Sequence, residues 1–201
     1  MLPGLTTADL AATALFALEG AVVGAASGLD VFGVLVVACV SALGGGTLRD
    51  LLIGAVPTAS VDDVRYVTVS LLGGLTAFAT YRLAFDTSSE PVVLLDAAGL
   101  SLFAVVGATK AHDFSLPAFS AALIGTVTAV GGGVMRDLLV GRVPLVLRED
   151  VYATAALLGA GIVAAGLARG LDRTRVAVLG GMACFALRVL AHRYGWNLPT
   201  A

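Results

Sequence analysis

Long apolar stretches separated by short polar connections run through the whole chain. An α-helix needs about 20 predominantly apolar residues to cross the hydrocarbon core of a membrane. On that basis the pattern predicts seven spanning helices, near residues 8–29, 31–53, 66–85, 92–110, 116–139, 151–168 and 174–192. The fold class that follows is an all-α, multi-pass integral membrane protein.

The sequence contains an internal repeat. Sliding the chain by 87 residues aligns Asp9–Gly74 with Asp96–Gly161 without a gap, and 25 of the 66 columns are identical. The strongest match is Gly-Gly-Gly-x-x-Arg-Asp-Leu-Leu, which begins at Gly44 and again at Gly131. Low complexity could mimic matched alanines and leucines, but it does not produce matched Arg-Asp and Pro columns.

Each copy holds three spans, an odd number, so the second copy enters the membrane from the opposite side. We therefore expect a 3+3 inverted-topology repeat plus one C-terminal helix. Within a single membrane domain of residues 1–201, the predicted parts are repeat 1 (8–87), repeat 2 (92–170) and a seventh helix (174–193).

Composition agrees with a lipid environment and excludes several classes of protein. Hydrophobic residues make up 58% of the chain, charged residues 13%, and the mean hydropathy is +0.97. A net charge of -2 does not indicate a nucleic-acid partner. The sequence shows neither a nucleophile–base set nor a phosphate-binding loop, so nothing in it points to an enzyme. The two cysteines and two histidines are isolated from one another, so we expect no metal site.

Three glycines in a row can serve a spanning helix in two ways. They remove packing side chains and favour a local break of the backbone hydrogen bonds, which would line a cavity with carbonyls and amides. Alternatively, they permit close crossing with another helix. We favour the break, because small-residue packing rarely needs three consecutive glycines. Inversion would bring the breaks of the second and fifth spans together from opposite leaflets.

The charges that follow the glycines lie at a depth where an unpaired charge costs several kcal/mol. Arg49 and Asp50 are consecutive, about 100° apart around a helix, so they face each other poorly. We therefore expect pairing between the repeats: Arg49 with Asp137, and Arg136 with Asp50. Such pairs could serve a permeation pathway or only hold the two halves together, and both interpretations stay open.

Further polar residues lie near the motif. Hydroxyls beside the glycines could supply oxygen ligands to a partly dehydrated cation, although helical serine and threonine more often bond their own backbone. Glu19 lies mid-span and could face the cavity or find a partner such as Lys110. The predicted pathway residues are Gly44, Gly45, Gly46, Thr47, Arg49, Asp50, Thr126, Thr128, Gly131, Gly132, Gly133, Arg136 and Asp137, with Ser41, Glu19 and Lys110 as additional candidates.

The duplicated motif, with Gly54-x-x-Pro57 and Gly141-x-x-Pro144 after it and a seventh helix, resembles the prokaryotic trimeric intracellular cation (TRIC) channels. The resemblance covers essentially the whole chain. It implies a homotrimer in the prokaryotic inner membrane, with one pore per protomer between the repeats and the Gly-Gly-Gly kinks of the second and fifth helices at its centre. It also implies permeant monovalent cations, chiefly K⁺.

Two transport functions remain as alternatives, beside a non-conducting scaffold that would show neither activity. The first is a K⁺-permeable channel in which oxygens near the glycines replace part of the ion's hydration shell. The second is a secondary transporter for glycine or a similar zwitterion, since inverted repeats with broken helices are a common transporter plan. Neither requires a cofactor, and the expected partners are membrane lipids, one of which could be bound, and monovalent cations. Animal members carry a lysine near the fifth-helix glycines, where this chain has Val134 and Met135, so their phosphoinositide gating is not expected here.

Overall fold

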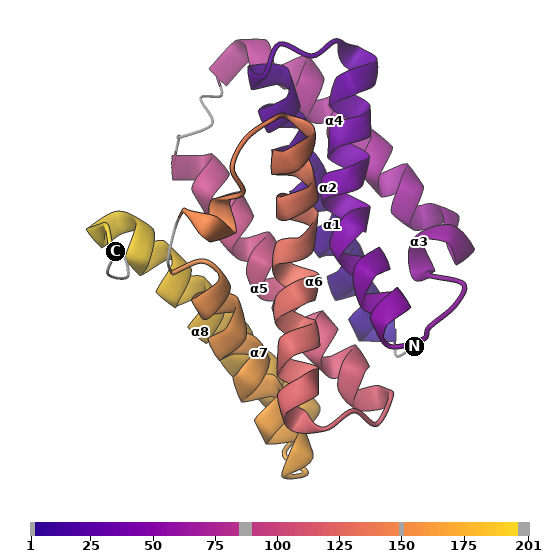
Figure 1. Cartoon of the computed structure of the whole chain (residues 1–201), viewed down its shortest axis with the longest axis vertical. Helices are drawn as coiled ribbons and strands as arrows, with labels where there is room; N and C mark the ends of the chain where they lie inside the picture. Colours follow the sequence, from indigo (N-terminus) through magenta and orange to yellow (C-terminus); the bar gives the residue numbers. More distant parts are fainter. Residues whose placement is uncertain (1–2, 85–89, 149–150, 197–201) are drawn as a thin grey trace.

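Seven long helices build the computed structural model of the chain, which describes residues 3–84, 90–148 and 151–196 (Figure 1). Each one corresponds to a predicted span. They are α1 (Pro3–Ala26), α2 (Val31–Leu52), α4 (Val64–Ala84), α5 (Glu90–Asp113), α6 (Ala118–Leu139), α7 (Ala153–Ala168) and α8 (Arg173–Tyr194). Two short helices, α3 (Ala59–Asp62) and η1 (Leu145–Leu147), follow α2 and α6.

Five of the described helices are long and apolar enough to cross a membrane: α1, α2, α5, α6 and α8. The other two differ in length and polarity. Helix α7 is strongly apolar but has only 16 residues, and α4 has 21 residues but is more polar. Both pack into the bundle with the others, α4 against α1 and α2, and α7 against α5, α6 and α8. The chain is an integral membrane protein, and its described residues form seven long helices.

The helices form two equivalent groups of three. Helices α1, α2 and α4 pack against one another, and so do α5, α6 and α7. The groups meet through α2 with α6 and α1 with α5, while α8 lies against α5 and α7 (Figure 1). This is the predicted 3+3 inverted repeat with one C-terminal helix.

The ends of α2 and α6 explain one part of the repeated motif. Gly54 and Gly141 follow these helices with positive φ angles of 74 and 70 degrees. Glycine adopts this left-handed conformation without strain. The Ala55 N–H donates to the Asp50 carbonyl at 2.8 Å, and the Arg142 N–H donates to the Asp137 carbonyl at 2.8 Å. These bonds are those of a Schellman motif, so the glycine turns the chain sharply after the Arg-Asp pair.

The expected break of the helices at the glycines is wrong, whereas the kink implied by the family resemblance stays a prediction. Helix α2 is continuous from Val31 to Leu52 and α6 from Ala118 to Leu139, so neither helix is interrupted at its glycine triplet. The central glycines instead mark a close crossing of the two helices. A Cβ on Gly45 would lie 2.2 Å from the Thr128 carbonyl oxygen, and one on Gly132 would lie 2.0 Å from the Ser41 carbonyl oxygen. Glycine is needed here because backbone touches backbone.

Candidate functional site

Arg49 is the centre of a buried charge cluster in the first repeat. Its guanidinium donates to both carboxylate oxygens of Asp9 on α1, at 3.2 and 3.1 Å, and through Nε to Asp50 Oδ1 at 2.7 Å. The Tyr66 hydroxyl on α4 donates to Asp9 Oδ2 at 3.0 Å. Arg49, Asp9 and Asp50 are each only 1% exposed. The cluster joins all three long helices of repeat 1.

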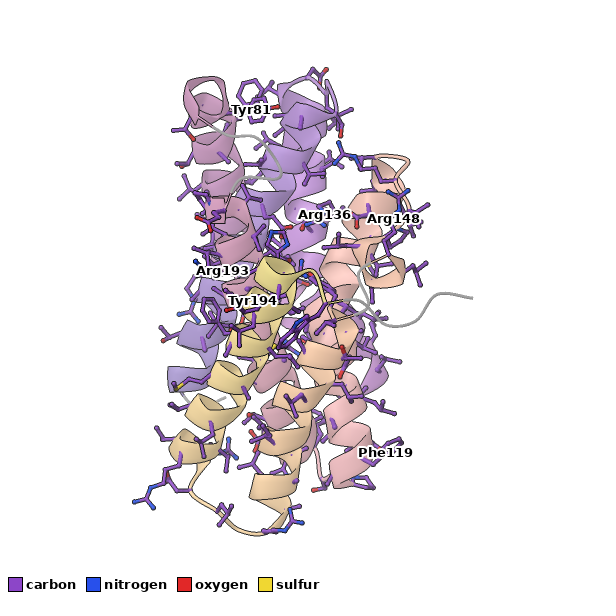
Figure 2. All side chains as sticks on the ribbon, turned by 90° about the vertical axis from the view of Figure 1, so that its left-hand side faces the viewer. Tyr81, Phe119, Arg136, Arg148, Arg193 and Tyr194 are labelled. Carbon is purple, nitrogen blue, oxygen red and sulfur yellow. The ribbon has the colours of Figure 1, made fainter. Side chains whose placement is uncertain are left out.

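Arg136 forms the corresponding cluster in the second repeat. Its Nε donates to Asp137 Oδ1 at 2.9 Å, as Arg49 does to Asp50. Asp96, the counterpart of Asp9, accepts from the Tyr152 hydroxyl at 2.7 Å and from Arg188 Nε on α8 at 3.3 Å. The Arg188 guanidinium also stacks over the Tyr152 ring, 4.8 Å from its centroid, as a cation–π contact. Figure 2 shows Arg136 inside the bundle and Arg148 on the neighbouring segment.

The aspartate of each motif also fixes the chain that follows it. Asp50 Oδ2 accepts the N–H of Ala59, the first residue of α3, at 2.9 Å. Asp137 Oδ2 accepts the N–H of Leu145, the first residue of η1, at 2.9 Å. A carboxylate that caps a helix start supplies a partner for an otherwise unsatisfied amide. Each aspartate thereby joins the arginine, the turn and the next helix.

The predicted pairing of Arg49 with Asp137 and of Arg136 with Asp50 is wrong. Each arginine donates through Nε to the aspartate next to it. The arginine side chain is long enough to reach the neighbouring carboxylate although the two side chains leave the helix about 100° apart. The contacts that do cross between the repeats involve other residues. Lys110 on α5 donates to Asp50 Oδ1 at 2.7 Å, and Arg136 donates to Glu19 on α1. Glu19 thus pairs with Arg136 and not with Lys110.

These crossed contacts compensate charge between the halves. Several kcal/mol per ion are lost when charges leave water, and close partners with full hydrogen bonding offset that loss. Asp9 and Glu19 are both on α1, roughly 15 Å apart along the axis at the ordinary helical rise. The two clusters therefore lie at different depths, on either side of the Gly45–Gly132 crossing. Phe16 of α1 and Phe103 of α5 stack between them, with ring centroids 5.3 Å apart.

The hydroxyl candidates divide into two kinds. Thr126 and Thr128 donate to the carbonyls of Ala122 and Ile124, one turn earlier in their own helix. The Thr47 hydroxyl lies 2.8 Å from that of Ser60. Ser41 is fully buried, and its hydroxyl has no hydrogen-bond partner among the residues that the structure describes. Of these four, Ser41 retains an unused oxygen near the helix crossing.

Two cavities open between the repeats, one toward each end of α5. The first, of about 310 Å³, is lined by Glu19, Val23, Asp96 and Asp137 together with Arg136 and residues of the following loop. The second, of about 800 Å³, is lined by Lys110, Asp62, Asp113 and Arg173 among others. Asp96 and Lys110 lie toward opposite ends of α5. At the ordinary helical rise, their spacing in the sequence separates them by roughly 21 Å along the axis. The two cavities are separated by the glycine crossing and the phenylalanine stack.

Several members of the clusters were not predicted from the sequence. Asp9 and Asp96 are a matched column of the repeat and could have been recognised by that signal. Tyr66 and Tyr152 are one residue out of register in a gapless alignment, because repeat 2 has one residue fewer between its aspartate and the next helix start. Arg188 belongs to α8, outside the repeat, and has no internal counterpart.

The fold and the two buried clusters define a class: inverted-repeat membrane proteins with an arginine–aspartate cluster in each half. Comparison of the chain with known protein families also indicates a membrane protein with an internal repeat. The family model described as "Glycine transporter" matches the chain twice, over residues 6–82 and 93–169. A UPF0126 membrane protein of Vibrio cholerae is 34% identical over 192 residues, covering 96% of this chain and 80% of the relative. The UPF0126 inner membrane protein YadS of Escherichia coli is 32% identical over 194 residues, covering 96% and 93%.

Solved structures give the same assignment. A TRIC trimeric intracellular cation channel orthologue from Rhodobacter sphaeroides superposes with a TM-score of 0.89 at 34% identity, covering 96% of this chain and 98% of that one. A prokaryotic TRIC channel in 0.5 M KCl superposes with a TM-score of 0.89 at 31% identity, covering 98% and 100%. This chain belongs to the family of these prokaryotic TRIC channels, and it also matches the family model described as "Glycine transporter". The inner-membrane location predicted from the sequence agrees with these relatives.

Proposed function

We propose that the protein is a K⁺-permeable cation channel that assembles as a homotrimer, with one pathway in each protomer between the two repeats. The observation that carries the proposal is the pair of cavities on opposite sides of the Gly45–Gly132 crossing. One reaches Arg136 and Asp137, and the other reaches Lys110, which donates to Asp50. Relatives with 31% and 34% identity and nearly full coverage are described as TRIC cation channels, which supports the same function.

The buried charges suit a cation pathway because the motif arginines are neutralised. Arg49 and Arg136 would repel a permeating cation if they were unpaired, but each bonds carboxylates from two positions. The pathway is closed at the crossing, where α2 and α6 are in backbone contact. Conduction requires these two helices to separate, and the glycines leave no side chains to obstruct the gap.

The test is reconstitution of the purified protein in planar bilayers under K⁺, Na⁺ and Cl⁻ gradients. Single-channel steps with a reversal potential near that of K⁺ are the expected result, and protein-free bilayers are the control. A native mass corresponding to three chains tests the trimer. Current that follows the Cl⁻ gradient, or no current with correctly folded protein, would contradict the proposal.

A glycine transporter is the second candidate, favoured by the description of the matching family model. The same proteoliposomes distinguish the two functions. Saturable, counter-ion-dependent uptake of labelled glycine without single-channel steps would replace the channel by a transporter. Single-channel steps without uptake of labelled glycine would exclude the transporter.

A further inference from the structure

The two repeats differ at one pair of equivalent positions that faces the motif aspartates. In repeat 2, Lys110 reaches across to Asp50, and its ammonium lies 2.7 Å from Asp50 Oδ1. In the alignment of the repeats, the counterpart of Lys110 is Val23 on α1, and the counterpart of Asp50 is Asp137. The aspartate of repeat 1 therefore has a tethered cation, and the aspartate of repeat 2 has a valine in the corresponding place.

The hydrogen bonds of the two aspartates are otherwise the same. Asp50 Oδ1 accepts from Arg49 Nε and from Lys110, and its Oδ2 accepts a backbone amide. Asp137 Oδ1 accepts from Arg136 Nε, and its Oδ2 accepts a backbone amide. An ionised carboxylate has about four acceptor positions. Asp137 thus retains the position that the lysine occupies on Asp50.

A cavity lies at this place. Val23 and Asp137 both line the cavity of about 310 Å³. Glu19 lines it too, and Glu19 Oε2 has no hydrogen-bond partner among the described residues although the side chain is only 5% exposed. A buried carboxylate oxygen without a partner is costly, which independently indicates a missing cationic or donor ligand.

The charges point to a cation as that ligand. The Arg49 cluster, counted with Lys110, has two cationic and two carboxylate side chains; the Arg136 cluster, counted with Arg188, has two cationic and three carboxylate side chains. Arg142 and Arg148 also line the cavity, but both are exposed. Water and salt screen exposed charges much more than buried ones. With its three carboxylates ionised, the buried part of the cavity wall is therefore short of one positive charge.

We propose that a monovalent cation binds in this cavity between Asp137 and Glu19, at the position equivalent to the ammonium of Lys110. Potassium and ammonium ions are similar in size, so a site shaped for one suits the other. The described residues contain no group of three or more His, Cys, Asp or Glu side chains arranged to hold a metal ion, which disfavours a divalent ion. The inference rests on the proposed cation channel and names a binding site on its pathway.

The first test is equilibrium binding of ⁸⁶Rb⁺ to the purified protein in N-methylglucamine chloride. We expect about one Rb⁺ per protomer for the wild type. Val23→Lys should place a tethered ammonium at Asp137 and weaken Rb⁺ binding at least about tenfold through charge repulsion at close range. Val23→Met, of similar length without charge, is the matched control and should weaken it much less. Equal binding by the Lys and Met variants would overturn the proposal.

The mirror experiment removes the tethered cation from the other half. Lys110→Met should free the position on Asp50 and raise the stoichiometry to two Rb⁺ per protomer. Its unfolding temperature should rise with KCl more steeply than that of the wild type, because a ligand that binds only the folded protein stabilises it. An unfolding temperature that is insensitive to KCl, with no second Rb⁺, would contradict the equivalence of the two positions.

Bilayer currents separate this site from the function itself. K⁺ current without Rb⁺ binding by the wild type would eliminate the site and leave the channel standing. Rb⁺ binding that Val23→Lys abolishes, without current or cation flux, would keep the site and eliminate the channel.

Discussion

At the scale of single residues, the buried arginines depend on carboxylates from two positions at once. Arg49 shares its donors between Asp9 on another helix and Asp50 beside it. Removing one member of a buried ionic cluster is far more damaging than removing an exposed pair, because the remaining charge stays in a medium that solvates it poorly. We therefore expect the α1 carboxylate of Asp9 to be required for a stable cluster.

Asp9→Asn should destabilise the protein by about 3 kcal/mol, since Arg49 would lose a bidentate charged partner. Exposure of the buried thiol of Cys184 to a fluorogenic maleimide during heating reports the unfolding temperature. Asp63→Asn is the matched control, because Asp63 pairs with Arg65 on the exposed surface. Exposed pairs contribute little to stability, so its loss should hardly change that temperature. Similar losses in both variants would show that burial does not govern these pairs.

At the scale of helices, the three glycines of each motif have different surroundings. Gly45 touches the backbone of α6, whereas a Cβ on Gly46 would meet nothing nearer than the end of the Arg49 side chain, at 3.7 Å. A Cβ on Gly44 would lie 2.7 Å from Met135 Sδ, a flexible atom that can move. Close approach therefore explains the middle glycine best.

Gly45→Ala should separate α2 from α6 and sharply reduce the yield of folded protein. A Cβ 2.2 Å from a carbonyl oxygen cannot be accommodated without moving a helix. Gly46→Ala should be tolerated and could gain up to about 1 kcal/mol from helix propensity. Size-exclusion profiles and unfolding temperatures of the two variants test this. Equal damage by both would favour a requirement for backbone flexibility over close packing.

At the scale of the whole molecule, the inverted repeat places equivalent loops on opposite sides of the membrane. The loop after α1 contains Leu29, and the loop after α5 contains Phe114; both residues are exposed. In a background with both native cysteines replaced by alanine, Leu29→Cys and Phe114→Cys should react with a membrane-impermeant maleimide from opposite faces of oriented vesicles. Labelling of both from the same face would contradict the inversion.

The sequence predicted the helices and the repeat, but not the partners within the clusters. Spanning length and matched columns depend on local pattern, so the seven helices and their duplication were predicted correctly. The pairing of Arg49 and Arg136 depends on how far a long side chain reaches and on which helices meet, neither of which is a local property. Tyr66 and Tyr152 were hidden by the one-residue difference between the loops, and the glycine crossing by the assumption that three glycines break a helix.

Glu19 of repeat 1 and Lys110 of repeat 2 each bond a charged residue of the other repeat. This asymmetry has a consequence for how such a protein can arise. An ancestor with a single repeat, pairing with an inverted copy of itself, would necessarily have two identical ends. Two copies of repeat 1 would bury surplus carboxylates at both ends, and two copies of repeat 2 would place a lysine at both. Duplication and fusion into one chain allow one end to have a lysine while the other has none. Once the two halves had diverged at these positions, neither could replace the other.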